Sequence, residues 1–363
     1  AMGYKVCVLD PDIQSPAGAL AEKLIQADYT DKAALKEMAS ICASVSTEFE
    51  NVPAQALDAL EALGVFVAPR SSCVSLAQNR IAEKKFLETW KTQTNIGPAP
   101  YFVIEHDADL ADVPVTLFPG ILKTARLGYD GKGQITVYDA INLAAAWAEL
   151  GKVPCVLEQR LDLDFEVSAL VVRGYDDDVV SYQVSQNIHR NGILHTSTVP
   201  APSLKPGQEK KIIEAAKALI RKIDYVGVLC VEFFVLKSGD IVANEIAPRP
   251  HNSGHYTMDA CVSSQFEQQV RAMARLPLGD TRLLTPVSML NLLGDLWFED
   301  IGDKVKEPAW HKVLAHPDAK LHLYGKDTPR VGRKMGHINC LGESLGQARQ
   351  NCAAVAQELG IEP

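Results

Sequence analysis

The sequence predicts a mixed α/β and α+β protein that is divided into more than one domain. Short apolar runs alternate with segments of helical spacing over residues 1–160, which is typical of a sheet covered by helices. Beyond that point, longer apolar runs that are typical of strands predominate. In addition, a chain of 363 residues, 47% of them hydrophobic, is too long for one ordinary hydrophobic core.

Two kinds of spacing predict the individual elements. Runs of adjacent or alternating apolar residues predict strands at residues 6–9, 44–47, 65–67, 121–123, 135–138, 155–158, 165–173, 179–186, 226–236, 240–245 and 320–324. Apolar residues three or four apart predict helices at residues 17–25, 32–41, 77–90, 140–150, 209–223 and 344–359. A further helix is expected to start at Pro53, because proline is favoured in the first helical turn.

The N-terminal region is expected to be a doubly wound, Rossmann-like domain that lacks its first strand. Such a domain normally opens with a central strand and a glycine-rich turn. This sequence instead begins with Ala1-Met2, which we interpret as the last turn of a helix that Gly3 terminates. We therefore expect that one strand and one helix, roughly 20–25 residues by average element lengths, precede this point.

Charge and composition exclude several classes of function. The formal net charge is −9, and broad nucleic-acid binding requires a basic surface instead. No apolar run is long enough to span a membrane, and the first residues lack the apolar stretch of a secretory signal. The eight cysteines include no Cys-x-x-Cys pair and mostly lie in apolar runs, as buried thiols do in a reducing compartment. We expect a cytoplasmic protein that binds neither nucleic acid nor membrane.

A glycine-rich segment, residues 128–133, has the sequence Gly-Tyr-Asp-Gly-Lys-Gly and lies between two expected strands. Its three glycines would let backbone amides approach a phosphate, and Lys132 would add a positive charge. A flexible hairpin turn is an equally good interpretation of the segment alone, because Asp-Gly is a common hairpin dipeptide. Lys123 favours the phosphate site, since a lysine at the end of an apolar strand needs an anionic partner.

Two isolated carboxylates lie in neighbouring apolar strands. Glu232 lies within the run 226–235, and Glu245 closes the strand that follows the turn at residues 238–240. Hard oxygen ligands in this arrangement suit Mg²⁺, although edge glutamates that face solvent are the alternative. Glu158 and Glu166 are further acids in apolar surroundings. Glu166 could accept hydrogen bonds from ribose hydroxyls or form a salt bridge in the core.

Two polar segments are candidates for substrate binding. The segment at residues 246–255 presents Arg249, two histidines, Asn252 and Ser253 directly after a buried strand, and two prolines stiffen it. Residues 326–334 form a basic turn in an acidic protein, which would suit a phosphate monoester. A solvated charged turn is the alternative for the second segment.

Taken together, these segments resemble the 5-(carboxyamino)imidazole ribonucleotide synthetases, a branch of the ATP-grasp superfamily. The resemblance extends from Gly3 to about His337. The segments that carry it are residues 9–12, 48–53, 123–134, 225–234, 244–255 and 320–334. It implies a pre-ATP-grasp domain at residues 1–76 and an ATP-grasp domain at residues 77–270, with a lid at 77–160 and a metal- and nucleotide-binding part at 161–270. A C-terminal domain at residues 271–363 would complete the substrate site.

The resemblance also implies a role for individual residues. For ATP it implies Arg80, Lys123, Gly128, Tyr129, Asp130, Gly131, Lys132, Gly133, Gln134, Glu158, Gln159, Arg160, Leu161, Glu166, His189, Asn244 and Glu245. For Mg²⁺ it implies Glu232 and Glu245 with Asn244. For the ribonucleotide it implies Glu48, Asn51, Arg249, His251, Asn252, Ser253, Lys326, Arg333 and Lys334. Tyr129, Asp130, Lys132 and Arg249 would act at the reacting centre.

The implied activity is ATP- and bicarbonate-dependent carboxylation of 5-aminoimidazole ribonucleotide through carboxyphosphate, in de novo purine biosynthesis. A homodimer and transient transfer of the product to a mutase are implied as well. Two alternatives stay open at this stage. One is another ATP-grasp ligase, such as a formate-dependent transformylase or a biotin carboxylase. The other is a nucleotide-binding relative without catalysis, against which Glu232, Glu245 and Lys132 argue.

Overall fold

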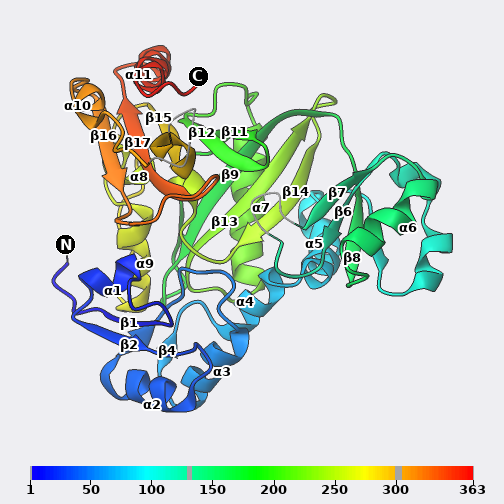
Figure 1. The fold of residues 1–363 in the computed structure, drawn as a ribbon, viewed down its shortest axis with the longest axis horizontal. Helices are drawn as coiled ribbons and strands as arrows, with labels where there is room; N and C mark the ends of the chain where they lie inside the picture. The colour runs from blue at the N-terminus through cyan, green and yellow to red at the C-terminus, as the bar shows by residue number, and fades with distance from the viewer. Residues whose placement is uncertain (1, 129–132, 299–304, 363) are drawn as a thin grey trace.

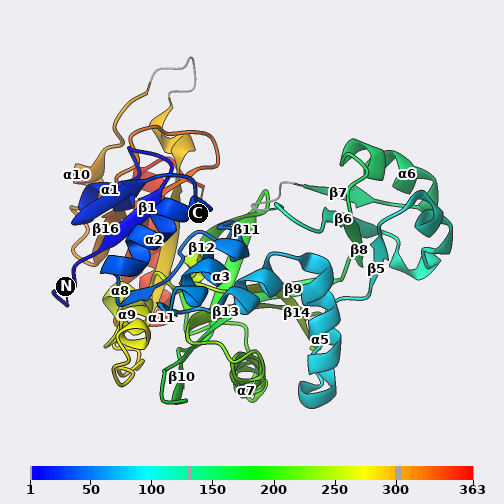
Figure 2. The same ribbon diagram turned by 90° about the horizontal axis from the view of Figure 1, so that it is seen from below.

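The computed structural model describes residues 2–128, 133–298 and 305–362 of the chain. An N-terminal region, a small lid and a large central sheet that continues into the C-terminal region make up the molecule (Figure 1). The lid projects from one side of the central sheet, and the N-terminal and C-terminal regions lie toward its other side (Figures 1 and 2).

The described N-terminal region contains two separate pairs of parallel strands. β1 (Cys7–Asp10) pairs with β2 (Lys23–Gln26), and β3 (Ser44–Val45) pairs with β4 (Phe66–Val67). The connecting helices are α1 (Pro16–Leu20), α2 (Lys32–Ile41) and α3 (Ala54–Ala62). Leu35, Leu57 and Val74 are among the buried residues that pack these elements together.

Two expectations for this region are wrong. The predicted helix at residues 17–25 ends at Leu20, and Lys23–Gln26 form a strand. The adjacent apolar residues Leu24 and Ile25 fit either spacing, and parallel pairing with β1 decides for the strand. Met2 is not helical, although Gly3 does have a positive φ of 78°.

The predicted helix at residues 77–90 is confirmed from Arg80 onward, but Ala77 belongs to a separate helix that precedes it. α4 (Ser71–Ala77) ends before Asn79, and α5 (Arg80–Thr94) begins directly after it. The Asn79 side chain accepts hydrogen bonds from the backbone N–H groups of Ile81 and Ala82, which is an N-cap. The break makes Arg80 the first residue of α5.

The lid is a four-stranded antiparallel sheet in the order β5-β8-β6-β7. Its strands are β5 (Tyr101–Ile104), β6 (Gly120–Thr124), β7 (Gln134–Val137) and β8 (Cys155–Gln159). Helix α6 (Ala140–Glu149) packs against it through Leu143 and Trp147, which share a buried cluster with Leu122 and Leu157. Lys123 therefore projects from a strand whose other residues anchor the lid core.

The central sheet has the order β14-β13-β9-β11-β12-β15-β17-β16, with β10 paired to β9. The strands are β9 (Leu163–Arg173), β10 (Val179–Ser181), β11 (Ser185–Arg190), β12 (Ile193–Val199), β13 (Gly227–Leu236), β14 (Ile241–Ala247), β15 (Val287–Leu293), β16 (Ala319–Leu323) and β17 (Lys334–Leu341). The predicted strand at residues 179–186 is interrupted, because Tyr182 turns into the core and its hydroxyl donates to the Ser263 carbonyl. Sequence spacing did not indicate β12, β15 or β17.

Helices cover both faces of the central sheet. α7 (Gln208–Lys222) and α5 share one buried cluster with β9 and β13. α8 (Thr257–Ala260) packs on the opposite side with Leu170, Val228 and Cys230, and α9 (Gln265–Met273) follows it along the chain. α11 (Leu345–Glu358) and α10 (Trp310–Val313) pack against the C-terminal strands. None of the helices in the described part of the chain combines the length and apolar character that a membrane span requires.

Candidate active site

A cavity of about 330 Å³ lies between the lid, strands β13 and β14, and the start of β17. Cationic, acidic and histidine side chains line it together with a small apolar wall. The described lining residues are Glu50, Arg80, Ile121, Lys123, Gly128, Gly133, Gln134, Leu163, Glu166, His189, Gly192, Leu194, Glu232, Phe234, Asn244, Glu245, Ala247, Arg249, His251, Asn252 and Lys334. The N-terminal region, the lid and the central sheet all contribute to it.

A bulge between β13 and β14 brings three candidate metal ligands to this cavity. Glu232 lies directly opposite Glu245, and Phe233 lies opposite Ala243, so Asn244 has no partner in the register. The extra residue allows Asn244 and Glu245, although consecutive, to line the same cavity. The Asn244 amide donates to Glu232 Oε2 at 3.4 Å.

The carboxylate pair has the electrostatics of a cation site. Burial and the neighbouring charge of Glu245 raise the pKa of Glu232 to about 7. A divalent cation between the two carboxylates would remove this repulsion, and oxygen ligands suit Mg²⁺. No group of three or more His, Cys, Asp or Glu side chains that could hold a metal occurs in the described residues. Two carboxylates fit Mg²⁺ nevertheless, because this ion commonly takes its remaining ligands from water and substrate phosphates.

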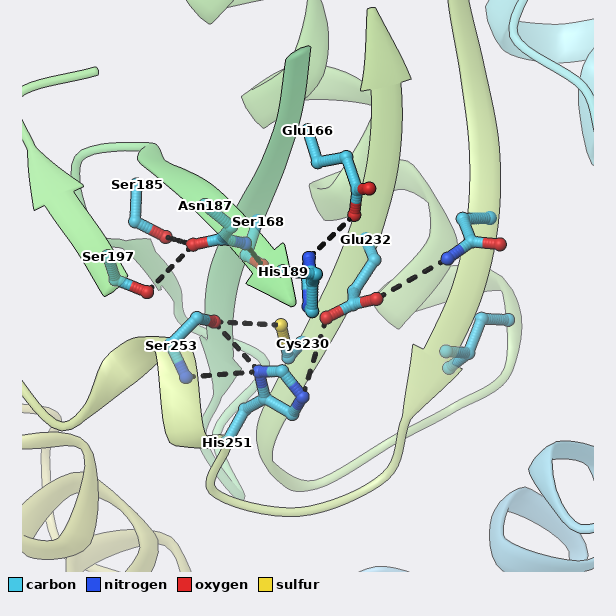
Figure 3. Close-up of polar contacts among 12 residues, drawn as sticks. Glu166, Ser168, Ser185, Asn187, His189, Ser197, Cys230, Glu232, His251 and Ser253 are labelled. Atoms are coloured by element: carbon cyan, nitrogen blue, oxygen red, sulfur yellow. Dashed lines mark hydrogen bonds and ion pairs between the residues drawn. The ribbon is translucent and has the colours of Figure 1, made fainter. Parts of the chain in front are cut away.

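Glu166 and His189 form a second pair beside the carboxylates. His189 Nδ1 lies 2.8 Å from Glu166 Oε2, and the pair sits next to Glu232 (Figure 3). Burial alone would lower the pKa of His189, but the contact with Glu166 outweighs it and raises the pKa. The Glu166 carboxylate is therefore held in place at the wall of the cavity.

On the lid side, buried charges surround Glu158. Its Oε2 atom lies 3.1 Å from the Lys123 ammonium and 3.3 Å from that of Lys84. Burial acts to raise the pKa of Glu158, but Lys123, Lys84 and Arg80 together lower it to about 2. Arg80 lines the cavity, and its buried Nε atom has no hydrogen-bond partner among the described residues. Such an orphaned donor fits an anionic ligand.

The segment after β14 is held from both sides. Arg249 binds the Glu50 carboxylate through Nη2 at 2.6 Å, which links the N-terminal region to the cavity. His251 Nδ1 contacts Ser253 Oγ at 2.7 Å, and its Nε2 lies 3.6 Å from Glu232 (Figure 3). Burial and the charge of Arg249 lower the pKa of His251 well below its usual value. Both amide atoms of Asn252 are buried without a partner among the described residues, as expected for a ligand contact.

The basic turn contributes one cation directly to the cavity. Lys334, the first residue of β17, lines it. Lys326 donates to the Lys334 carbonyl at 2.7 Å, and Arg333 donates to the Thr328 carbonyl at 2.6 Å, so both side chains lie along the turn. Lys326 and Arg249 also interact electrostatically with Glu48.

The glycine-rich segment borders the cavity at both of its ends. Gly128 and Gly133 line the cavity, whereas Tyr129, Asp130, Gly131 and Lys132 lie outside the described residues. Gly133 has a φ of 69°, and a Cβ atom there would come within 2.7 Å of Thr124 Oγ1. Glycine is therefore required at this position on both conformational and steric grounds.

Several residues assigned to the site from sequence do not line the cavity. Glu48, Glu158, Gln159, Arg160, Leu161, Ser253, Lys326 and Arg333 lie outside its described lining, and Asn51 lines a smaller adjoining space. The backbone N–H groups of Gln159 and Arg160 already donate to Pro100 and Pro119. Glu158 instead holds Lys123, and Ser253 holds His251.

Other residues at the site were not assigned from sequence. Glu50 lies within a segment that was singled out, and its salt bridge to Arg249 is a contact between residues far apart in the chain. Glu83 and Lys84 lie in the lysine- and glutamate-rich helix α5, where spacing alone gave no sign of burial. Phe234, Leu163 and Leu194 supply the apolar wall.

The fold and this site define an ATP-grasp protein, in which a lid and a central sheet enclose a nucleotide site. Comparison with family models agrees: residues 90–266 match the ATP-grasp domain, residues 1–78 the ribonucleotide synthetase preATP-grasp domain, and residues 287–351 the phosphoribosylaminoimidazole carboxylase C-terminal domain. These three matches follow one another along the chain in the order of its three regions.

Similar proteins identify the family more closely. The N5-carboxyaminoimidazole ribonucleotide synthase of Brucella melitensis is 42% identical over 340 residues, which cover 93% of this chain and 89% of that protein. The N5-carboxyaminoimidazole ribonucleotide synthetase of Thermus thermophilus superimposes with a TM-score of 0.88 at 33% identity, covering 100% of this chain and 94% of that one. The Aspergillus clavatus synthase in complex with ADP and 5-aminoimidazole ribonucleotide gives a TM-score of 0.85 at 27% identity, covering 99% and 93%. The chain belongs to the family of N5-carboxyaminoimidazole ribonucleotide synthases.

Proposed function

We propose that the protein carboxylates 5-aminoimidazole ribonucleotide at the expense of ATP, with bicarbonate as the carbon source, in de novo purine biosynthesis. The observation that carries the proposal is the cavity in which Glu232 and Glu245 face one another beside Arg80, Lys123 and Arg249. Family membership, shown by relatives such as one at 42% identity over 93% of this chain, supports the choice of substrate.

In the first step, a bicarbonate oxygen attacks the γ-phosphorus of ATP, the bond to the β-phosphate oxygen breaks, and ADP and carboxyphosphate form. Arg80 and Lys123 neutralise the charge that develops on the phosphate oxygens. Glu232 and Glu245, with Asn244, hold Mg²⁺, which when bound stabilises the charge of the transferred phosphoryl group.

In the second step, the amino nitrogen of the ribonucleotide forms a bond to the carboxyl carbon. Inorganic phosphate leaves as its bond to the carboxyl carbon breaks, either in this step or just before it as carbon dioxide is released, and it accepts the proton that the amino nitrogen loses. Arg249, His251 and Asn252 lie together at the cavity wall, where they would bind the bicarbonate-derived group and the imidazole. Lys334, which lines the cavity, would bind the ribonucleotide phosphate together with Lys326 and Arg333, whose side chains donate to backbone carbonyls of the same turn.

Exclusion of water follows from the chemistry, because carboxyphosphate is short-lived in water. Gly128 and Gly133 of the glycine-rich segment line the cavity, and we assign Tyr129, Asp130 and Lys132 to the reacting centre. The ribose hydroxyls would bind Glu166, which His189 holds in place.

The test is the rate of ADP release with each substrate withheld in turn. Turnover should need ATP, bicarbonate and 5-aminoimidazole ribonucleotide together, and formate should not replace bicarbonate. ADP release that is unaffected by the ribonucleotide would contradict the proposal, and turnover with formate would favour a transformylase.

The assembly and setting of the enzyme are part of the proposal. We expect a homodimer that acts in the cytoplasm and transfers its unstable product to a mutase. Eight free cysteines, six of them buried, support a reducing compartment. Sedimentation velocity would decide between dimer and monomer.

A further inference from the structure

The edge of the central sheet at β14 is bound by side chains on both sides of Glu245. β14 is an edge strand of the sheet, so its outer backbone groups have no neighbouring strand of that sheet. Side chains of α5 and the Gly97 carbonyl bind them instead. The Glu83 carboxylate accepts a hydrogen bond from the Ile246 backbone N–H at 2.7 Å. The Lys84 ammonium donates to the Asn244 carbonyl at 3.0 Å. The peptide groups that flank Glu245 are therefore fixed from α5.

The Glu83 and Lys84 side chains are more deeply buried than they need to be to cover the edge of the sheet. Glu83 is 1% exposed and Lys84 is 0% exposed. Edge strands are ordinarily protected by exposed lysines, prolines, bulges or covering segments. Here the neighbouring Ala243 N–H donates to the Gly97 carbonyl, which shows that a backbone group can satisfy a hydrogen-bonding group of this edge strand. Buried charges carry a large desolvation penalty, and apolar residues of similar volume are often as stable or more so.

Lys84 also reaches the lid. Its ammonium lies 3.3 Å from Glu158 Oε2, and the same oxygen lies 3.1 Å from Lys123. One buried lysine thus joins the backbone beside Glu245 to the carboxylate that holds a phosphate-contacting lysine. Arg80, one turn earlier on α5, has its backbone N–H bound to the Ala125 carbonyl of the lid. The first turns of α5 connect the cation side of the cavity to its phosphate side.

We propose that Glu83 and Lys84 are positioning residues that hold Glu245 in the geometry for binding the metal–nucleotide complex. Lys84 in addition couples that carboxylate to Lys123 through Glu158. The inference rests on the proposed function, which assigns Mg²⁺ to Glu232 and Glu245. Partners that hold a metal ligand from behind typically change metal affinity by about 10- to 100-fold when they are removed.

The test measures binding of Mn²⁺·ADP, with Mn²⁺ replacing Mg²⁺ so that electron paramagnetic resonance reports the bound ion. Glu83→Met and Lys84→Met each remove one of the two backbone contacts while keeping a side chain of similar length. Each should weaken binding of Mn²⁺·ADP by about 10-fold or more. Glu83→Gln retains an acceptor oxygen and should stay close to the wild-type affinity. Lys85→Met, an exposed neighbour on the same helix, is the matched control and should leave affinity unchanged.

A second measurement separates positioning from simple loss of stability. The melting temperature is recorded without metal and nucleotide, and the metal dependence of turnover is recorded at saturating substrates. If Glu83 and Lys84 are positioning residues, folded Glu83→Met and Lys84→Met proteins should need a higher metal concentration for turnover. Glu83→Gln should need the same metal concentration as the wild type. A lower melting temperature with unchanged Mn²⁺·ADP affinity would overturn the inference. If one methionine variant does not fold, the other gives the same test from the opposite side of Glu245.

Failure of the proposed function would look different. In that case the wild-type protein itself would not bind Mn²⁺·ADP, or Glu245→Gln would bind it as tightly as wild type. Wild-type binding that depends on Glu245 but not on Glu83 or Lys84 would overturn only the positioning role.

Discussion

Glu158→Gln is the substitution whose cost can be worked out most directly from the structure. The Glu158 carboxylate is 3% exposed and is the shared partner of Lys84 and Lys123. Glutamine keeps the size and one acceptor oxygen but removes the negative charge. Two lysines would then share a buried site without their counter-ion, which is among the few strongly destabilising single changes.

The magnitude follows from the pKa. The surrounding cations, acting against burial, lower the pKa of Glu158 from 4.5 to about 2. One pKa unit corresponds to about 1.4 kcal/mol, so the charged carboxylate stabilises the fold by about 3 kcal/mol at pH 7. Burial lowers the pKa of Lys123 despite the nearby Glu158, so burial offsets part of the stabilisation that the pair provides. We therefore expect Glu158→Gln to lower the free energy of unfolding by an amount at the lower end of the 3–5 kcal/mol typical of broken buried pairs.

The same pKa predicts a pH dependence with a definite sign. Because the pKa is lower in the folded state than in the unfolded state, the stabilisation is present above about pH 4.5 and is lost as the pH falls toward 2. The difference in the free energy of unfolding between wild type and Glu158→Gln should therefore be largest near neutral pH. It should narrow steadily as the pH is lowered from 5 toward 3.

The assay is urea unfolding followed by tryptophan fluorescence and circular dichroism at several pH values. Asp107→Asn, which breaks an exposed pair with Lys152, is the control and should cost no more than about 1 kcal/mol. If Glu158→Gln and wild type unfold with the same urea midpoint at pH 7, the proposed stabilisation by Glu158 is refuted. A difference that does not change between pH 7 and pH 3 would refute it as well.

Three further predictions concern catalysis and binding. Glu245→Gln should lower turnover by about 100-fold or more, because it removes a carboxylate from Mg²⁺. Raising the magnesium concentration should recover part of the lost turnover. An unchanged rate at limiting magnesium would contradict this role. Lys326→Ala should raise KM for the ribonucleotide by about 10-fold with little change in KM for ATP, since charge-assisted hydrogen bonds contribute about 1.5–3 kcal/mol. A change in KM for ATP alone would assign Lys326 to the nucleotide instead. Asn252→Ala should weaken substrate binding without lowering the melting temperature of the unliganded protein, because both amide atoms of Asn252 lack partners in the described part of the chain. A large loss of stability would show that these atoms do have partners.

The strand positions of the two carboxylates that we propose as Mg²⁺ ligands were predictable because they depend on local spacing. A single acid within an apolar strand is visible at period two, and Glu232 and Glu245 both stand out in this way. The role of Asn244 beside them was suggested only by the family resemblance. In the structure a bulge leaves Asn244 without a register partner and places it in the cavity lining, and spacing within one strand does not encode such a bulge.

Other parts of the site were hidden because they depend on contacts between distant segments. The pairing of Glu50 with Arg249 joins residues 199 positions apart, and neither residue's neighbours indicate it. Glu83 and Lys84 have the composition of a solvated helix face, yet tertiary packing buries them. The same cause explains the error at residues 17–25, where pairing with β1 overrode an ambiguous apolar spacing.

The sequence by itself determined the alternation of strands and helices, the single acidic residue in each of two apolar strands, the glycine-rich segment and the family that these motifs resemble. Each of these depends on residues near one another in the chain, where periodicity and turn chemistry act. Tertiary structure alone decided which charges are buried and which group holds which. Burial and partner choice are set by the packing of whole elements, as the contacts of α5 with the edge of β14 illustrate.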